Sequence, residues 1–111
     1  MMPPTTNSRN VQVWLATTPV DMRKSFDGLA EVVRSFLGHD PLSGSLFVFR
    51  NRGGHLLKVL WWDRGGLTIY YKRLERGSFR FPDANCPAVQ ITSDDLLKLL
   101  SGLDATGRRR A

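Results

Sequence analysis

The spacing of hydrophobic residues divides the chain into strand-like and helix-like stretches. Hydrophobic and polar residues alternate over residues 11–15, which predicts a short strand. Residues 18–21 then resemble a helix-starting capping box with Thr18 as the cap, and Gly38 supplies a later stop. We therefore expect an N-terminal amphipathic helix from about Met22 to Leu37. Its hydrophobic face is formed by residues at helical spacing, namely Phe26, Leu29, Val33 and Phe36.

Three strand-like segments with glycine-containing connections follow the predicted helix. They cover residues 46–49, 56–62 and 67–74, and the connections cover residues 51–54 and 63–66. Because glycine adopts the positive φ that hairpin turns require, this arrangement predicts an antiparallel meander. A further short strand is expected over residues 88–91. Thr92 then caps a final helix that is rich in leucine.

These elements predict the fold class and the domain organisation. The fold class is α+β, with an antiparallel β-meander packed with an N-terminal amphipathic helix and a short C-terminal helix. A chain of 111 residues fits one domain. We expect a disordered lead-in over residues 1–10, a single α+β domain over residues 11–104, and a basic flexible tail over residues 105–111.

The positive charge of the chain is concentrated in one segment. The sequence holds 16 Lys and Arg against 10 Asp and Glu, which gives a formal net charge of +6. Between residues 50 and 80, eight basic and two acidic residues leave the same +6, so the rest of the chain sums to zero. Such a field suits a polyanion, nucleic acid first, and the alternative is a basic surface without a specific partner. The candidate phosphate contacts are Arg50, Arg52, Lys58, Arg64, Lys72, Arg73, Arg76 and Arg80.

Two aromatic pairs, Trp61-Trp62 and Tyr70-Tyr71, lie in the same segment. Side chains alternate along a strand, so one member of each pair is expected in the core and the other could stack on bases. A three-residue turn between the two strands leaves Trp62, Tyr70 and Lys72 outside the core. A two-residue turn centred on the two glycines instead frees Trp61, so the choice between the tryptophans stays open. Tyr70 and Lys72 point outward in both registers, and their alternative role is cross-strand packing or a protein interface.

The sequence carries no recognisable catalytic constellation. His39, His55 and Cys86 have no metal-ligand spacing, and the carboxylates are not clustered as a two-metal site requires. Arg-Gly-Gly triplets at residues 52–54 and 64–66 are typical of single-strand-binding repeats, but their positions between apolar strands favour turns. We therefore expect no enzyme, no metal and no cofactor. One cysteine, no signal-like start and no long apolar run predict a cytoplasmic protein.

Four motifs, in order along the chain, resemble one small protein family. They are VWLATTPVDMRKSFDGL from residue 13, LFVFR from residue 46, KVLWWD from residue 58 and YKRLERG from residue 71. In order and spacing they resemble the TnpB accessory-protein family of bacterial insertion sequence 66 elements, from about residue 11 to residue 104. The resemblance implies a protein that transposition needs, encoded beside a larger transposase that carries the carboxylate active site.

Charge and resemblance together predict a non-catalytic accessory factor that binds DNA at element ends, with a separate transposase as its partner. Tyr70 and either Trp61 or Trp62 are the candidate base-stacking residues. The alternative is a protein–protein adaptor that docks on the transposase through its aromatic face and final helix. Nothing in the sequence favours a third possibility, a small nuclease.

Overall fold

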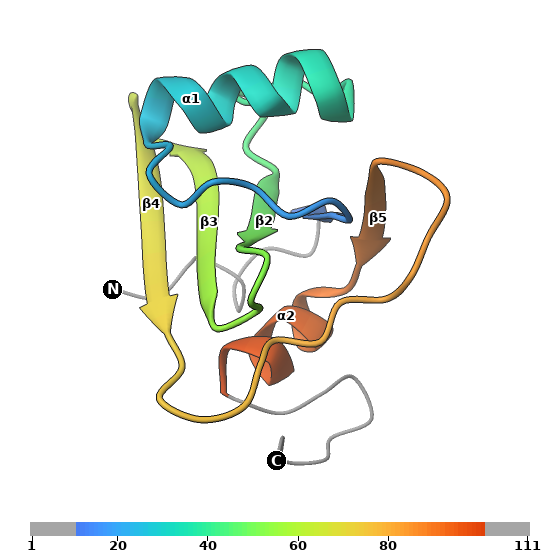
Figure 1. Ribbon diagram of the computed structural model, residues 1–111. Coiled ribbons are helices and arrows are strands. Elements are labelled where there is room, and N and C mark those ends of the chain that lie inside the picture. Colours follow the sequence, from blue (N-terminus) through green and yellow to red (C-terminus); the bar gives the residue numbers. More distant parts are fainter. Residues whose placement is uncertain (1–10, 102–111) are drawn as a thin grey trace.

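Five strands form one sheet in the computed structural model, which describes residues 11–101 (Figure 1). The strands are β1 (Val13–Ala16), β2 (Leu46–Arg50), β3 (Leu56–Asp63), β4 (Gly66–Arg73) and β5 (Ala88–Ile91). Their order across the sheet is β4-β3-β2-β1-β5. The expected lead-in over residues 1–10, the last residues of the expected domain and the expected tail over residues 105–111 lie outside the described residues.

The sheet is mixed, so the expectation of a purely antiparallel meander is wrong in part. The meander covers β2, β3 and β4, which pair antiparallel in sequence order. β1 runs parallel to β2, and β5 returns antiparallel to β1 on the far side. A parallel pair needs a long crossover, which the helical segment between β1 and β2 supplies. Alternation along one strand does not reveal which strand lies beside it, so the sequence pattern missed this pairing.

The first helical segment lies between β1 and β2, and so it is not N-terminal in the fold as expected. It consists of α1 (Phe26–Glu31) and a π-helical continuation, η1 (Val32–Leu37). It begins at Phe26 and not at Met22, and Thr18 does not cap it. Asp21 instead accepts a hydrogen bond from the backbone N–H of Arg23 at 2.9 Å, which stabilises a turn ahead of the helix.

α1 and η1 bury only part of the hydrophobic residues that predicted them. Leu29 and Val33 are buried, as expected, whereas Phe26 and Phe36 are exposed. For Phe36, which lies in η1, the reason is the wider π turn, which changes the angle between successive side chains so that helical spacing no longer marks one face. Gly38 ends the segment with a φ of 73°, and this stop was predicted.

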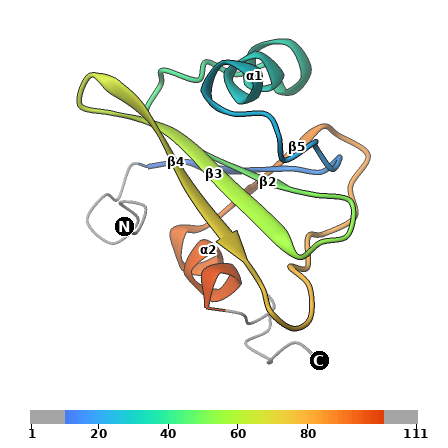
Figure 2. The same cartoon turned by 60° about the vertical axis from the view of Figure 1, so that its left-hand side comes forward.

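The helical segments cover opposite faces of the sheet (Figure 2). α1 and η1 pack on one face, around a core that includes Phe47. α2 (Ser93–Leu100) packs on the other face, around a core that includes Trp61. Thr92 caps α2 as predicted, because its hydroxyl accepts a hydrogen bond from the backbone N–H of Asp95 at 3.0 Å. Since both faces are covered, a side chain on either face is exposed only where the helices do not reach.

A tight turn, Arg64-Gly65, joins β3 to β4 and sets their register. The two turn residues have φ values of 48° and 87°, and positive φ at both positions is characteristic of the type I′ hairpin turn. Asp63 pairs with Gly66 across this turn. The α1 face of the hairpin therefore carries the group expected for a two-residue turn, namely Leu60, Trp62, Leu67, Ile69 and Tyr71. The turn itself lies one residue earlier than that expectation placed it.

Candidate nucleic-acid interface

The predicted phosphate contacts separate into three groups in the structure. Arg64 is exposed at the tip of the β3–β4 hairpin, at the upper left of Figure 1. Arg50, Lys58 and Lys72 belong to strands and are partly or fully buried. The remaining four are exposed at the opposite end of the sheet, which we call the arginine end, and they are Arg52, Arg73, Arg76 and Arg80.

Backbone hydrogen bonds hold the two segments of the arginine end together. The N–H of Leu74 donates to the carbonyl of His55 at 2.8 Å, and the N–H of Phe79 donates to that of Gly54 at 2.7 Å. These bonds join the β2–β3 turn to the segment that follows β4, in the lower part of Figure 1. Gly54 is buried with a φ of 76°, and a Cβ there would lie 3.2 Å from Cβ of Ser78. The close approach of the two segments therefore requires glycine.

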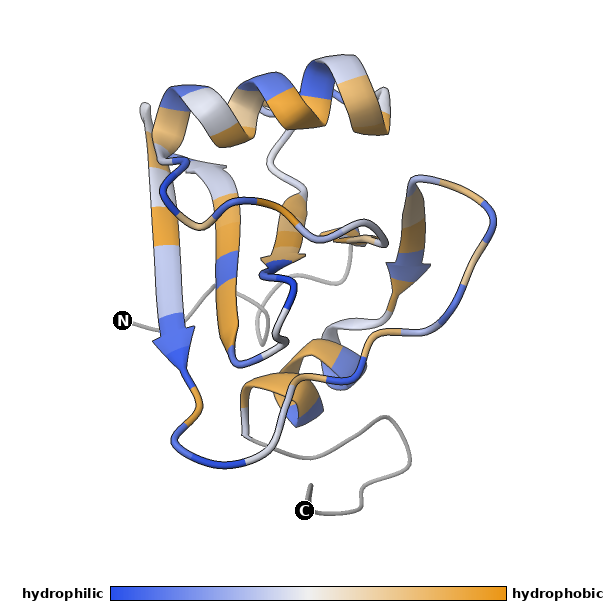
Figure 3. Ribbon diagram, viewed as in Figure 1, coloured by the Kyte–Doolittle hydropathy of each residue, from blue (hydrophilic) through white to orange (hydrophobic). Residues whose placement is uncertain are grey.

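The arginine end carries more positive charge than its own carboxylates neutralise. Nε of Arg73 donates to Glu75 at 3.0 Å in an exposed ion pair. Within residues 11–101, Arg52, Arg76 and Arg80 make no ion pair. Figure 3 shows the end of β4 and the β2–β3 turn as hydrophilic segments beside hydrophobic strand interiors. Three exposed guanidinium groups are therefore available to an anion.

Lys58 is buried, which contradicts its assignment as a surface phosphate contact. Only 6% of the residue is exposed. Its ammonium group donates hydrogen bonds to the backbone carbonyls of Met22 and Lys24, both at 2.8 Å, and lies 4.6 Å from the centre of the Tyr71 ring. Burial lowers the pKa of the Lys58 ammonium below its ordinary value. Lys58 thus holds the turn before α1 against the sheet.

Arg50 is half-buried and also has a role inside the fold. One of its terminal nitrogens donates to the carbonyl of Thr17 at 3.1 Å. The guanidinium carbon lies 5.1 Å from the centre of the Phe81 ring, within the range of a cation–π contact. Its backbone carbonyl accepts a hydrogen bond from the N–H of Val20 at 2.9 Å. Arg50 therefore joins the loop after β1 to the segment before β5.

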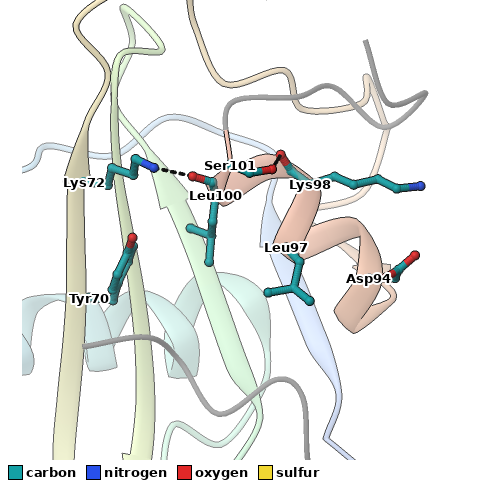
Figure 4. Close-up of a pocket in the computed structure, with 7 residues that line it drawn as sticks. All are labelled: Tyr70, Lys72, Asp94, Leu97, Lys98, Leu100 and Ser101. Atoms are coloured by element: carbon teal, nitrogen blue, oxygen red, sulfur yellow. Dashed lines mark hydrogen bonds between the residues drawn. The ribbon is translucent and has the colours of Figure 1, made fainter. Parts of the chain in front are cut away.

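Tyr70 and Lys72 point toward α2 and not into solvent, so the expectation that both are outward in either register is wrong. Figure 4 shows both side chains on β4, with α2 opposite them. The ammonium group of Lys72 donates to the backbone carbonyl of Leu100, the last residue of α2. Tyr70 is half-buried and packs against the core on this face. The prediction failed because it assumed that one face of the hairpin stays uncovered.

The exposed aromatic residues of the hairpin are Trp62 and Tyr71. Trp62 is 36% exposed and Trp61 only 2%. A two-residue turn was expected to free Trp61, and that expectation is wrong because Trp61 packs in the core beneath α2. Tyr71 is 52% exposed, although both expected registers placed it in the core. It lines a shallow pocket together with His55 and Arg73, among others. Alternation along β4 gave no signal for this, because the exposure of Tyr71 depends on how far α1 extends over the sheet.

Comparison with known proteins places the chain in a family. Residues 11–110 match the family model described as IS66 Orf2 like protein. The chain belongs to the IS66 Orf2-like family. It is 48% identical over 98 residues to uncharacterized protein y4hO of Sinorhizobium fredii (strain NBRC 101917 / NGR234), covering 88% of this chain and 85% of that protein. It is 37% identical over 103 residues to uncharacterized protein y4jC of the same strain, covering 93% and 88%. No solved structure matches.

Family membership makes this IS66 Orf2-like chain an accessory protein of an insertion sequence, in a family that is generally non-catalytic. The matched range includes all five strands and both segments of the arginine end. Among residues 11–101, no group of three or more His, Cys, Asp or Glu side chains is placed to hold a metal ion. Over the same residues, no helix has the length and apolar character to cross a membrane.

Proposed function

We propose that this IS66 Orf2-like protein is a non-catalytic accessory factor that binds DNA at the ends of its element, in the cytoplasm. The arginine end carries this proposal, because two bonded segments present Arg52, Arg76 and Arg80 exposed and, among the described residues, without ion pairs. A guanidinium group donates hydrogen bonds in a planar fork that fits phosphate oxygens. DNA is the polyanion on which transposition acts, so family and surface chemistry point to the same ligand.

The exposed cations at the two ends of β4 define the length of the proposed contact. β4 has 8 residues, so its ends lie about 23 Å apart at roughly 3.3 Å per residue. Arg64 precedes one end and Arg73 occupies the other. A duplex rises about 3.4 Å per base pair, so a backbone lying along β4 would span roughly seven base pairs. These contacts to phosphate position the protein and carry no sequence information themselves.

Trp62, one of the two candidate tryptophans, and Tyr71, in place of Tyr70, are the proposed base-stacking residues. Both lie on the α1 face of the hairpin and both are exposed. Aromatic rings beside cations are the usual platform for unpaired bases, because every base has a face that stacks. Tyr71 lies two residues before Arg73 on the same face of β4. Unpaired or distorted bases at an element end are therefore the proposed ligands of this face.

The separate transposase is the proposed protein partner. A factor without a catalytic site acts through the enzyme that breaks and joins the DNA strands. An adaptor that binds only the transposase is the second candidate, and the exposed aromatic rings of Trp62 and Tyr71 favour it. Both candidates predict that a column of nuclease-treated transposase retains this protein, and only the adaptor predicts retention of a protein that does not bind DNA.

Binding of purified protein to labelled DNA tests the proposal. Fluorescence anisotropy would use an element-end duplex, a single strand of the same length and a random duplex. We expect binding at micromolar concentration or tighter, and a single-strand preference if the aromatic rings stack. The random duplex should bind nearly as well, because phosphate contacts dominate. Absence of salt-dependent binding to all three, with folded protein at micromolar concentration, would refute DNA binding.

A further inference from the structure

β4 is a long strand at the edge of the sheet. It has 8 residues, whereas β5, at the other edge, has 4. Among the described residues, the side of β4 away from β3 has no neighbouring strand. An edge strand of this length presents a row of backbone donors and acceptors to which another extended chain can pair.

The register of the hairpin shows which backbone groups face outward. In a two-residue hairpin the residues that flank the turn, here Asp63 and Gly66, bond to each other, and bonded pairs then alternate along the strands. The N–H of Leu74 donates to the carbonyl of His55 at 2.8 Å, and this pair falls where the alternation places a bonded pair. The backbone groups that face away from β3 are therefore those of Leu67, Ile69, Tyr71 and Arg73.

A groove between β4 and α2 lies along one side of this edge. Tyr70 and Lys72 line it from β4, and Leu97 and Lys98 line it from α2 (Figure 4). On the opposite side of the edge, Tyr71 and Arg73 line the shallow pocket described above. Side chains of an added strand would alternate between the two sides, so each side chain would meet either the groove or the pocket.

The side chains of β4 specify the chemistry of such a strand. Gly66–Arg73 contains no acidic residue, and its two cations, Lys72 and Arg73, are adjacent at its end. Arg73 pairs with Glu75 in an exposed ion pair, for which an acidic residue of the added strand would substitute. The first half of β4 is apolar and β-branched, with Leu67 and Ile69 half-buried. In an antiparallel pair, the first residues of the added strand lie opposite the last residues of β4. Acidic residues followed by alternating β-branched residues therefore complement β4.

We infer that the outer edge of β4 is a docking site for an extended segment of a partner protein, added as an antiparallel strand that begins with acidic residues and continues with β-branched ones. The main-chain bonds would supply affinity, and the groove and the pocket would supply selectivity. This site does not depend on DNA binding, because its donors and acceptors are backbone groups of the sheet edge. The added strand would contact Arg73 of the arginine end and leave Arg52, Arg76 and Arg80 exposed.

A synthetic peptide tests the site directly. The probe is acetyl-Glu-Glu-Val-Thr-Val-Thr-Val-amide, titrated into ¹⁵N-labelled full-length protein. The amide signals of Leu67, Ile69, Tyr71 and Arg73 should shift most and become protected from solvent exchange. A control peptide with N-methyl groups at alternate residues, which removes the donors on one edge, should not bind. Equal shifts with both peptides, or no shift of these amides at millimolar peptide, would overturn the inference.

Charge exchange tests the direction of the added strand. Arg73→Glu should weaken binding of the probe roughly fivefold. The same substitution should improve binding of a peptide that has two Lys in place of the two Glu. Arg34→Glu, on η1, is the matched control and should change neither affinity. Sedimentation of the free protein tests whether a second copy of the chain occupies the edge instead. A dimer in which the outer amides of β4 are already protected from exchange would show that it does. If duplex DNA displaced the probe and N-methylation of the probe did not weaken its binding, the edge would be assigned to nucleic acid.

Discussion

The ammonium group of Lys58 lies 4.6 Å from the centre of the Tyr71 ring. The same group donates to the carbonyls of Met22 and Lys24, so one side chain joins β3 and β4 to the turn before α1. Lys58 was expected to bind phosphate, but its ammonium group is buried and bound to groups of the protein itself. The exposed ring above it is the part of this arrangement that a ligand can reach.

Lys58→Met should destabilise the protein without weakening DNA binding. It leaves the two carbonyls without their donor, which costs about 1–3 kcal/mol of unfolding free energy. Lys24→Met, at an exposed side chain, is the control and should change stability little. Urea denaturation measures the difference. A Lys58→Met protein that is fully stable but has lost DNA affinity would show that Lys58 acts at the surface.

The same variant has a defined pH dependence. Burial lowers the pKa of Lys58 in the folded state, so in the alkaline range below 10.5 the unfolded chain binds more protons than the folded chain. The stability of the native protein relative to Lys58→Met should therefore rise as pH increases toward 10.5. A difference that shrinks over this range would contradict the burial of the charged group.

Tyr71→Ala and Tyr70→Ala should affect different properties. Tyr71 is exposed, so its loss should weaken single-strand binding about tenfold or more, and stability should fall only by the contact with Lys58, about 0.5–1 kcal/mol. Tyr70 packs against the core beside α2, so its loss should lower stability and leave the affinity of the folded protein nearly unchanged. Anisotropy and urea denaturation on both variants separate the two roles. The reverse pattern would restore Tyr70 as the stacking residue.

Gly54→Ala should separate the two segments of the arginine end. The φ of 76° and the 3.2 Å approach to Ser78 both penalise a Cβ, at about 1–3 kcal/mol of stability. In the fraction that still folds, DNA affinity should fall because the arginines no longer act together. Gly66→Ala is the control, since a Cβ there meets nothing within 4 Å. If Gly54→Ala bound DNA normally, the junction would be irrelevant to binding.

Arg64→Asn should stabilise the hairpin and weaken DNA binding at once. Arg64 has a φ of 48°, which Asn before Gly tolerates better, for a gain of about 0.5–1 kcal/mol. Loss of its charge should lower DNA affinity severalfold. Arg64→Lys keeps both the charge and the strained φ, and should leave both properties near those of the native protein. Unchanged affinity in Arg64→Asn would remove the hairpin tip from the DNA contact.

The sequence predicted features that depend on neighbouring residues and missed those that depend on packing. The β2–β3–β4 meander and the cap at Thr92 follow from local turn and capping chemistry, and both are confirmed. The parallel pairing of β1 with β2 and the burial of Lys58 arise from contacts between distant segments. The exposure of Tyr71 in place of Tyr70 depends on how far each helix extends over the sheet. The charge of residues 50–80 was clear from composition, but its division between interior and surface was not.

The salt dependence of DNA binding shows whether the arginine end holds the DNA. Arg76→Ala with Arg80→Ala would be compared with a matched double variant, Arg34→Ala with Lys98→Ala, which removes the same charge from η1 and α2. The logarithm of the binding constant for an element-end duplex is measured against the logarithm of salt concentration. We expect the first variant to lose about two units of slope and most of its affinity, and the second to keep both. Equal losses in the two variants would show that net charge alone, and not the arginine end, attracts DNA.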